Sequence, residues 1–144
     1  MTPAHVTLSR AYVEGAHRHG VLVYGAAATL ELRDVAVAAT DPAPCGATTC
    51  EGEAGGSGVV CAAGASLDAQ RVLVERSSFA GLLLVEECGV SIVRGRVRDN
   101  VFGLVSDTEL PTGALSDVVF ERNEVDFQTT VIRVEPPDVE RVGL

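Results

Sequence analysis

Apolar and polar residues alternate in short runs along this chain, and the same run recurs about every 23 residues. Each run reads apolar–x–apolar, then any two residues, then a second triplet. This triplet begins with a small or apolar residue and ends with an apolar one. The runs begin at Val6, Leu30, Leu67, Val90 and Gly113. A glycine after each of the earlier runs opens a further short apolar segment: Gly20, Gly58, Gly81 and Gly103. A unit of this length cannot bury its apolar face alone, so the pattern predicts a stacked solenoid.

Each repeat has room for three short strands with period-two alternation, and no window shows the i, i+3, i+4, i+7 spacing of a helix. Parallel stacking places like residues of successive coils about 4.8 Å apart. We therefore expect three inward ladders of side chains. They are Val6, Leu30, Leu67 and Val90; Val13, Val37, Val74, Val97 and Phe120; and Val23, Cys61, Leu84 and Ser106. The glycines suit corners where the backbone turns tightly or approaches another segment closely.

Residues 6–40 and 72–106 carry the repeat most clearly, and Asn100 and Asn123 each follow a run by three residues. This pattern resembles the right-handed parallel β-helix family of pectate-lyase-like and periplasmic copper-maturation-type repeats. The resemblance implies an all-β, right-handed parallel β-helix of about five coils. It implies a partial asparagine ladder, because the earlier coils have Ala16, Thr40 and Ser77 at this position. This fold hosts lyases, hydrolases, adhesins and stalks, so it does not define an activity.

The frame divides the chain into a β-helix over residues 1–130 and a tail or linker over residues 131–144. An insertion at about residues 40–54 interrupts the second coil. Residues 1–5 are too short to cap the first coil and contain no signal peptide, so we expect a fragment of a longer protein. No apolar run is long enough to span a membrane.

The net charge is −9, and every basic residue is an arginine. This acidic balance argues against nucleic acid as a partner. The segment Arg94–Arg98 holds alternate arginines, of which Arg96 and Arg98 should project outward. Neighbouring coils supply acidic residues, so we favour a solvated, charge-paired face over an anion-binding site.

The four cysteines fall into two groups. Cys45 and Cys50 lie in the insertion, and we favour a local disulfide between them over half of a metal site. Cys61 falls on an inward ladder and should be a reduced, buried side chain. Cys88 has no evident partner. The disulfide and the resemblance suggest an extracellular or cell-surface location.

Candidate chemistry is sparse. On the first strand of each coil, Glu31 and Asp68 should lie on adjacent coils about 5 Å apart. Such a pair could act as an acid and a nucleophile or share a Ca²⁺ ion, with Arg33 and Gln70 beside it as binding residues. The alternative is the ordinary polar face of a sheet. His17 and His19 could clasp a metal or be solvated turn residues.

An outward apolar stripe on the third strand is the stronger signal, because exposed apolar ladders mark packing or binding surfaces. It consists of Leu22, Val60, Leu83 and Val105. The insertion or the tail could cover it; otherwise it could bind a polysaccharide or a protein. We therefore expect a non-catalytic extracellular module acting as a scaffold or binding surface, with no cofactor beyond a possible Ca²⁺. The alternative is a polysaccharide lyase or glycoside hydrolase.

Overall fold

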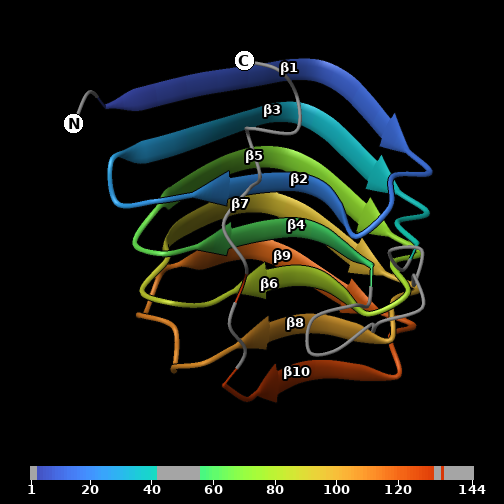
Figure 1. The fold of residues 1–144 in the computed structure, drawn as a ribbon. Coiled ribbons are helices and arrows are strands. Elements are labelled where there is room, and N and C mark those ends of the chain that lie inside the picture. The colour runs from blue at the N-terminus through green and yellow to red at the C-terminus, as the bar shows by residue number, and fades with distance from the viewer. Residues whose placement is uncertain (1–2, 42–55, 132–133, 135–144) are drawn as a thin grey trace, which may run out of the picture.

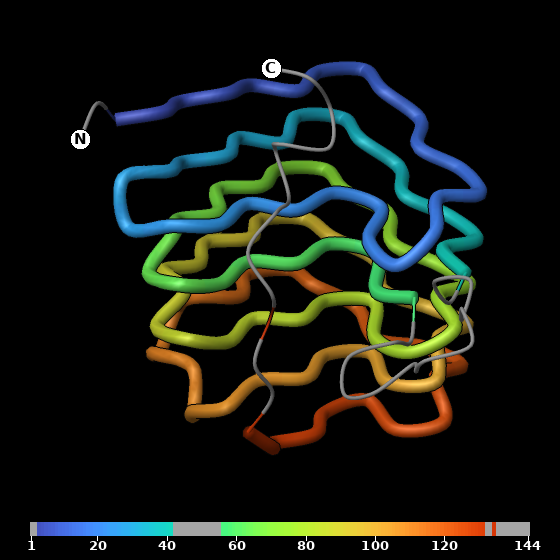
Figure 2. Tube along the Cα trace, in the orientation of Figure 1, coloured from blue at the N-terminus to red at the C-terminus, as the bar shows by residue number. Residues whose placement is uncertain are grey.

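The structure is a computed structural model that describes residues 3–41, 56–131 and 134. The described residues form a parallel β-solenoid of about five turns with no helix. Its strands belong to two five-stranded sheets that face each other, as Figure 1 shows. The chain passes from one sheet to the other and back in every turn, and Figure 2 traces this descent from β1 to β10.

The first sheet, called here the long sheet, contains the odd-numbered strands. In spatial order they are β1 (Ala4–Glu14), β3 (Ala28–Ala38), β5 (Ser66–Glu75), β7 (Gly89–Arg98) and β9 (Leu115–Glu121). The second, called the short sheet, contains the even-numbered strands. They are β2 (His19–Tyr24), β4 (Ser57–Ala62), β6 (Ala80–Leu84), β8 (Phe102–Ser106) and β10 (Val125–Thr129).

The strands pair in parallel and in the register that the sequence predicts. Leu30 pairs with Val6 on one side and with Leu67 on the other, and Leu67 pairs with Val90. The ladders from Val13 to Phe120 and from Val23 to Ser106 are confirmed in the same way. The main core therefore lies between the two sheets, with Leu32, Val74 and Ile92 among its fully buried side chains.

The strands of the long sheet differ from the expected pattern in one respect. The first two strands expected in each coil form one strand of up to 11 residues with a bend near its middle. One residue per strand has a positive φ there: Arg10, Asp34, Arg71, Arg94 and Asp117. Strand pairing skips this residue and resumes immediately after it. The two residues between the apolar pairs therefore make a bend too short to separate two strands.

A row of glycines allows the two sheets to approach each other. A Cβ atom on Gly58 would lie 2.5 Å from Val74 Cγ1, and one on Gly81 would lie 2.9 Å from Val97 Cγ1. Real Cβ atoms do not approach other atoms so closely, and neither glycine has a positive φ. Close approach, rather than a left-handed backbone, therefore explains these glycines.

The expected asparagine ladder is present at the corner beside these glycines. Asn100 Oδ1 accepts a hydrogen bond from the backbone N–H of Ser77 at 2.9 Å. Asn123 Oδ1 accepts one from the backbone N–H of Asn100, and Asn123 Nδ2 donates to the Val97 carbonyl at 3.1 Å. Buried Thr40 and Ser77 occupy the corner in earlier coils, so the ladder is partial as expected.

Candidate functional site: the outer face of the long sheet

The predicted carboxylate pair forms on the outer face of the long sheet. Glu31 pairs in register with Asp68, and Thr7 and Ser91 continue this row on the neighbouring strands. The Thr7 hydroxyl donates a hydrogen bond to Glu31 Oε2 at 3.1 Å, and His5 Nε2 lies 3.6 Å from Glu31 Oε1. The strand register alone is therefore sufficient to bring these side chains together.

Arg33 occupies the space between the two carboxylates. Its Nη2 lies 3.2 Å from Asp68 Oδ2 and 3.9 Å from Glu31 Oε1. Its Nη1 donates to the backbone carbonyls of Leu32 and Asp68. Gln70 pairs with Arg33 in the strand register. Glu31 and Asp68 thus belong to a partly exposed ion-pair network with a fixed cation at its centre.

This network has no feature of a metal centre. Within residues 3–41, 56–131 and 134, no group of three or more His, Cys, Asp or Glu side chains could hold a metal ion. Arg33 lies within ion-pair distance of both carboxylates, so each of them already has a cationic partner within the sheet. The arrangement therefore suits the polar face of a sheet better than general acid catalysis.

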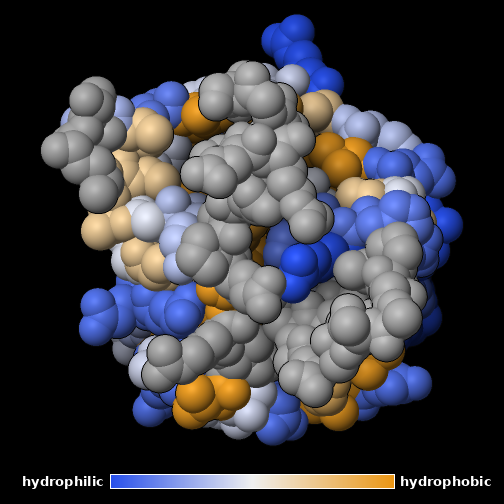
Figure 3. All heavy atoms as spheres, viewed as in Figure 1, coloured by the Kyte–Doolittle hydropathy of each residue, from blue (hydrophilic) through white to orange (hydrophobic). Residues whose placement is uncertain are grey.

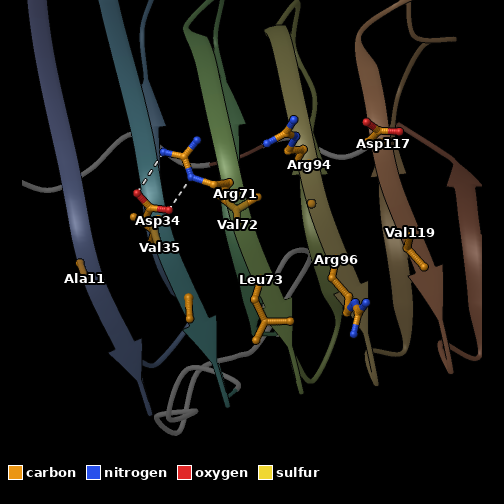
Figure 4. A pocket seen from close by; sticks show the side chains of 12 residues that line it. Ala11, Asp34, Val35, Arg71, Val72, Leu73, Arg94, Arg96, Asp117 and Val119 are labelled. Carbon is orange, nitrogen blue, oxygen red and sulfur yellow. Dashed lines mark hydrogen bonds and ion pairs between the residues drawn. The ribbon is translucent and has the colours of Figure 1, made fainter.

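The bend in each strand of the long sheet lines a shallow groove of about 510 Å³ (Figure 4). Asp34 and Arg71 meet along one side, where Nε–Oδ1 is 2.6 Å and Nη2–Oδ2 is 3.0 Å. The hydrogen bond from Arg71 lowers the pKa of Asp34 below its usual value. Leu73 and Val119 supply apolar surface to the groove, and Val119 is 47% exposed.

The charged side chains of this groove are three arginines and two aspartates, Asp34 and Asp117. Arg94, at a bend residue with φ 61°, lines the groove together with Arg71 and Arg96. Arg96 Nε lies 3.5 Å from Glu121 Oε1, whereas the described residues give Arg94 no ion pair. Figure 4 shows the Arg94 and Arg96 side chains on the same strand of the sheet. Arg94 is therefore the cation of the groove that is available to a ligand.

Outside the groove, several charges along the long sheet are paired as the sequence predicts. Arg98 Nε lies 2.8 Å from Glu75 Oε2, on the adjacent coil. Arg122 forms a two-point ion pair with Asp99, and this hydrogen bonding lowers the pKa of Asp99. Sequence reasoning missed the Asp34–Arg71 and Asp99–Arg122 pairs, although both recur at the spacing of one coil.

The apolar stripe on the short sheet points away from the main core, as expected, but most of it is covered. Val60, Leu83 and Val105 have no exposed surface, and Leu22 is half-buried. They form a second apolar cluster that includes Val134 of the tail, which is 3% exposed. In this structure the stripe is a packing surface, and its binding of a partner stays a prediction.

The prediction that Cys61 is a reduced thiol is wrong, because Cys61 forms a disulfide with Cys88. The two residues are 27 positions apart, and their Cα atoms are 5.6 Å apart. Gly89 pairs with Ser66, so Cys88 stands one coil beyond the buried corner residue Ala65. The sequence signal for this disulfide was the presence of a small residue, Ala65 or Cys88, at the same corner of adjacent coils. Cys45 and Cys50 lie outside the described residues.

The histidines expected as a possible metal clasp differ in their surroundings. His17 is exposed and forms a parallel bridge with Asp41, whereas His19 begins β2 and is partly buried. Burial, together with the positive charge of Arg18, lowers the pKa of His19 to about 4. His19 is therefore neutral at pH 7.

The comparisons with known proteins leave the function to be argued from this geometry. No protein-family model matches the chain, and no curated protein or solved structure is significantly similar to it. Among the described residues, no helix is both long and apolar enough to cross a membrane.

Proposed function

We propose that this chain is a non-catalytic β-helix module that acts outside the cell as a scaffold and binds an acidic polysaccharide along the long sheet. The observation that carries the proposal is the difference between the two outer faces. The stripe on the short sheet is covered, whereas the groove on the long sheet is open and combines Arg94 with apolar Leu73 and Val119. Sugar rings present both apolar faces and polar edges, so a groove of this composition suits a polymer bearing carboxylates.

The net charge of −9 does not oppose this proposal strongly. At physiological ionic strength charges are screened beyond about 8 Å, so a bound carboxylate responds mainly to the charges of the groove itself, where three arginines outnumber two aspartates. The Cys61–Cys88 disulfide supports a location outside the reducing cytosol. The stacked coils support a right-handed fold of the pectate-lyase-like kind, because parallel crossovers are almost always right-handed.

Binding to oligogalacturonides, followed by calorimetry, tests the proposal. Arg94→Gln should weaken binding by roughly tenfold, the effect of about 1.4 kcal/mol from one charge-assisted hydrogen bond. Arg122→Gln removes the same charge outside the groove and is the matched control. Neutral oligosaccharides should bind more weakly than uronides. Equal losses from the two variants would contradict a site in the groove.

The alternative function, a polysaccharide lyase or hydrolase, rests on the confirmed adjacency of Glu31 and Asp68. Arg33 between them is the observation against it. We expect neither unsaturated uronides nor new reducing ends from pectin or alginate. If these products accumulate with the native chain and either Glu31→Gln or Asp68→Asn abolishes them, the chain is an enzyme and the proposal of a non-catalytic module is wrong.

A further inference from the structure

The bends of the long sheet place one charged residue on every coil. In order along the solenoid they are Arg10, Asp34, Arg71, Arg94 and Asp117, called here the bend row. Adjacent strands lie about 4.8 Å apart, so the row is one continuous line of charges. Figure 4 shows four of its members, from Asp34 to Asp117, across the strands. The row therefore presents a cation, an anion, two cations and an anion to a ligand that follows the groove.

The first half of the bend row is neutralised within the sheet. Asp34 accepts two hydrogen bonds from Arg71. This hydrogen bonding lowers the pKa of Asp34, and the charge of Arg10 acts in the same direction. The charges of Asp34 and Arg71 therefore largely cancel, and neither is the main attraction for a charged ligand.

The second half of the bend row is open. Within the described ranges, neither Arg94 nor Asp117 forms an ion pair or a side-chain hydrogen bond. Both residues are exposed, and both line the groove. The residues on either side of them are paired in register, so Arg94 and Asp117 occupy equivalent positions on adjacent coils. The groove thus offers one cation and, one coil further along, one anion.

These two charges lie on the opposite side of the molecule from the second apolar cluster, which belongs to the outer face of the short sheet. Figure 3 views that other face, where hydrophobic residues lie among hydrophilic ones. On the face of the long sheet, Val119 follows Asp117 by two residues and is 47% exposed. The two charges are therefore placed where a long polymer can reach them.

Charges of opposite sign on adjacent coils select the order of groups along a ligand. A carboxylate suits Arg94, because a guanidinium can donate two parallel hydrogen bonds to it. Asp117 needs a donor, such as a hydroxyl or an amide N–H, and a second carboxylate there would face a like charge. One sugar unit of an extended polysaccharide advances by a distance close to the spacing of the coils. Successive sugars would therefore meet Arg94 and Asp117 in turn.

We propose that the groove selects acidic polysaccharides in which an acidic sugar alternates with a neutral one, and that Asp117 determines this specificity. The specificity rests on the proposed function, because the polymer must first bind in this groove. The acidic sugar binds Arg94 and the neutral sugar donates to Asp117, while Leu73 and Val119 contact the apolar faces of the rings. A polymer with a carboxylate on every sugar gains the first contact and loses the second.

Calorimetry at physiological ionic strength with two ligands of equal length tests this specificity. The first is an oligogalacturonide, with a carboxylate on every sugar, and the second is a hyaluronan oligosaccharide, in which glucuronate alternates with N-acetylglucosamine. The native chain should bind the alternating ligand more tightly. Asp117→Asn should strengthen binding of the oligogalacturonide about three- to fivefold, the effect of one exposed charge pair, and should weaken binding of the alternating ligand. Asparagine tolerates the positive φ of 54° at this position, so the variant should remain folded.

Glu124→Gln is the matched control, because it removes one exposed acidic charge outside the groove. It accounts for the general repulsion between a chain of net charge −9 and the more highly charged ligand, and it should leave the ratio of the two affinities unchanged.

A native chain that binds the oligogalacturonide at least as tightly as the alternating ligand overturns the proposed specificity. Asp117→Asn also overturns it if the variant changes the two affinities in the same direction or not at all. Both results leave polysaccharide binding itself intact. If the native chain binds neither ligand, the proposed function fails together with this specificity.

Discussion

At the scale of single residues, the glycine row shows how closely the two sheets are packed. Gly81 lies where an added Cβ would be 2.8 Å from Asn100 Nδ2 and 2.9 Å from the backbone oxygen of Gly103. The backbone oxygen belongs to a paired strand and cannot move freely. Glycine at this position is thus required by a neighbouring coil rather than by its own backbone conformation.

Gly81→Ala should therefore destabilise the fold by about 1–3 kcal/mol, the usual cost of overpacking a core. Gly89→Ala is the matched control, because its Cβ would lie 3.5 Å from Ser66 Oγ, an ordinary contact. Chemical denaturation of the two variants and the native chain measures the difference. Equal stability of the two variants would contradict the tight packing.

His19 provides a second test at this scale. Its pKa is about 4 in the folded chain because of burial and the charge of Arg18, against 6.5 for an unperturbed histidine. The unfolded chain therefore binds more protons between these two values, and stability falls as the pH drops from 6.5 towards 4. His19→Gln should flatten this part of the profile of unfolding free energy against pH. An unchanged slope in the variant would show that other groups cause it.

At the scale of elements, successive coils are joined by hydrogen bonds and by one covalent link. The disulfide joins Cys61, in β4, to Cys88, in the turn that precedes β7. Because each coil contacts mainly its neighbours, a link between adjacent coils restricts the unfolded chain while it adds little to the folded contacts.

Replacing both cysteines by alanine should lower the free energy of unfolding by about 2–4 kcal/mol, a typical value for a disulfide of this loop length. Urea denaturation of the double variant and of the native chain, without reductant, measures the loss. Alkylation of the native chain after denaturation, followed by peptide mapping, should leave Cys61 and Cys88 unlabelled. Labelling of either residue would contradict the pairing.

At the scale of the whole molecule, the two sheets have different outer faces. The long sheet is exposed and charged, and the short sheet carries an apolar cluster to which Val134 contributes. Val134 is 3% exposed although it lies well beyond the last strand. Val134 therefore contributes to the fold through its contact with this cluster.

Val134→Asp should expose the apolar cluster, because a carboxylate in place of this buried side chain would lie unpaired among apolar residues. The variant should bind more of a hydrophobic dye and should be less stable by about 2 kcal/mol or more. Val131→Asp is the control, since Val131 is 80% exposed. Similar dye binding by the two variants would show that Val134 does not shield the apolar cluster from solvent.

Much of this architecture could be predicted from the sequence. The spacing of Val6, Leu30, Leu67 and Val90 determined the parallel register, because stacked strands place like residues in contact. The same register predicted the adjacency of Glu31 and Asp68. Local alternation also predicted which residues of the short sheet face outward.

Other features depended on contacts between segments that the repeat does not relate. The Cys61–Cys88 disulfide and the contact of Val134 with the apolar stripe each join positions whose distance depends on a corner or on a residue outside the repeat. The bend at Arg94 and its equivalents also formed one strand where two were expected. Periodicity thus determined which residues stack, whereas the tertiary structure decided which face stays open, because that depends on contacts from outside the repeat, such as the one that Val134 makes with the apolar cluster.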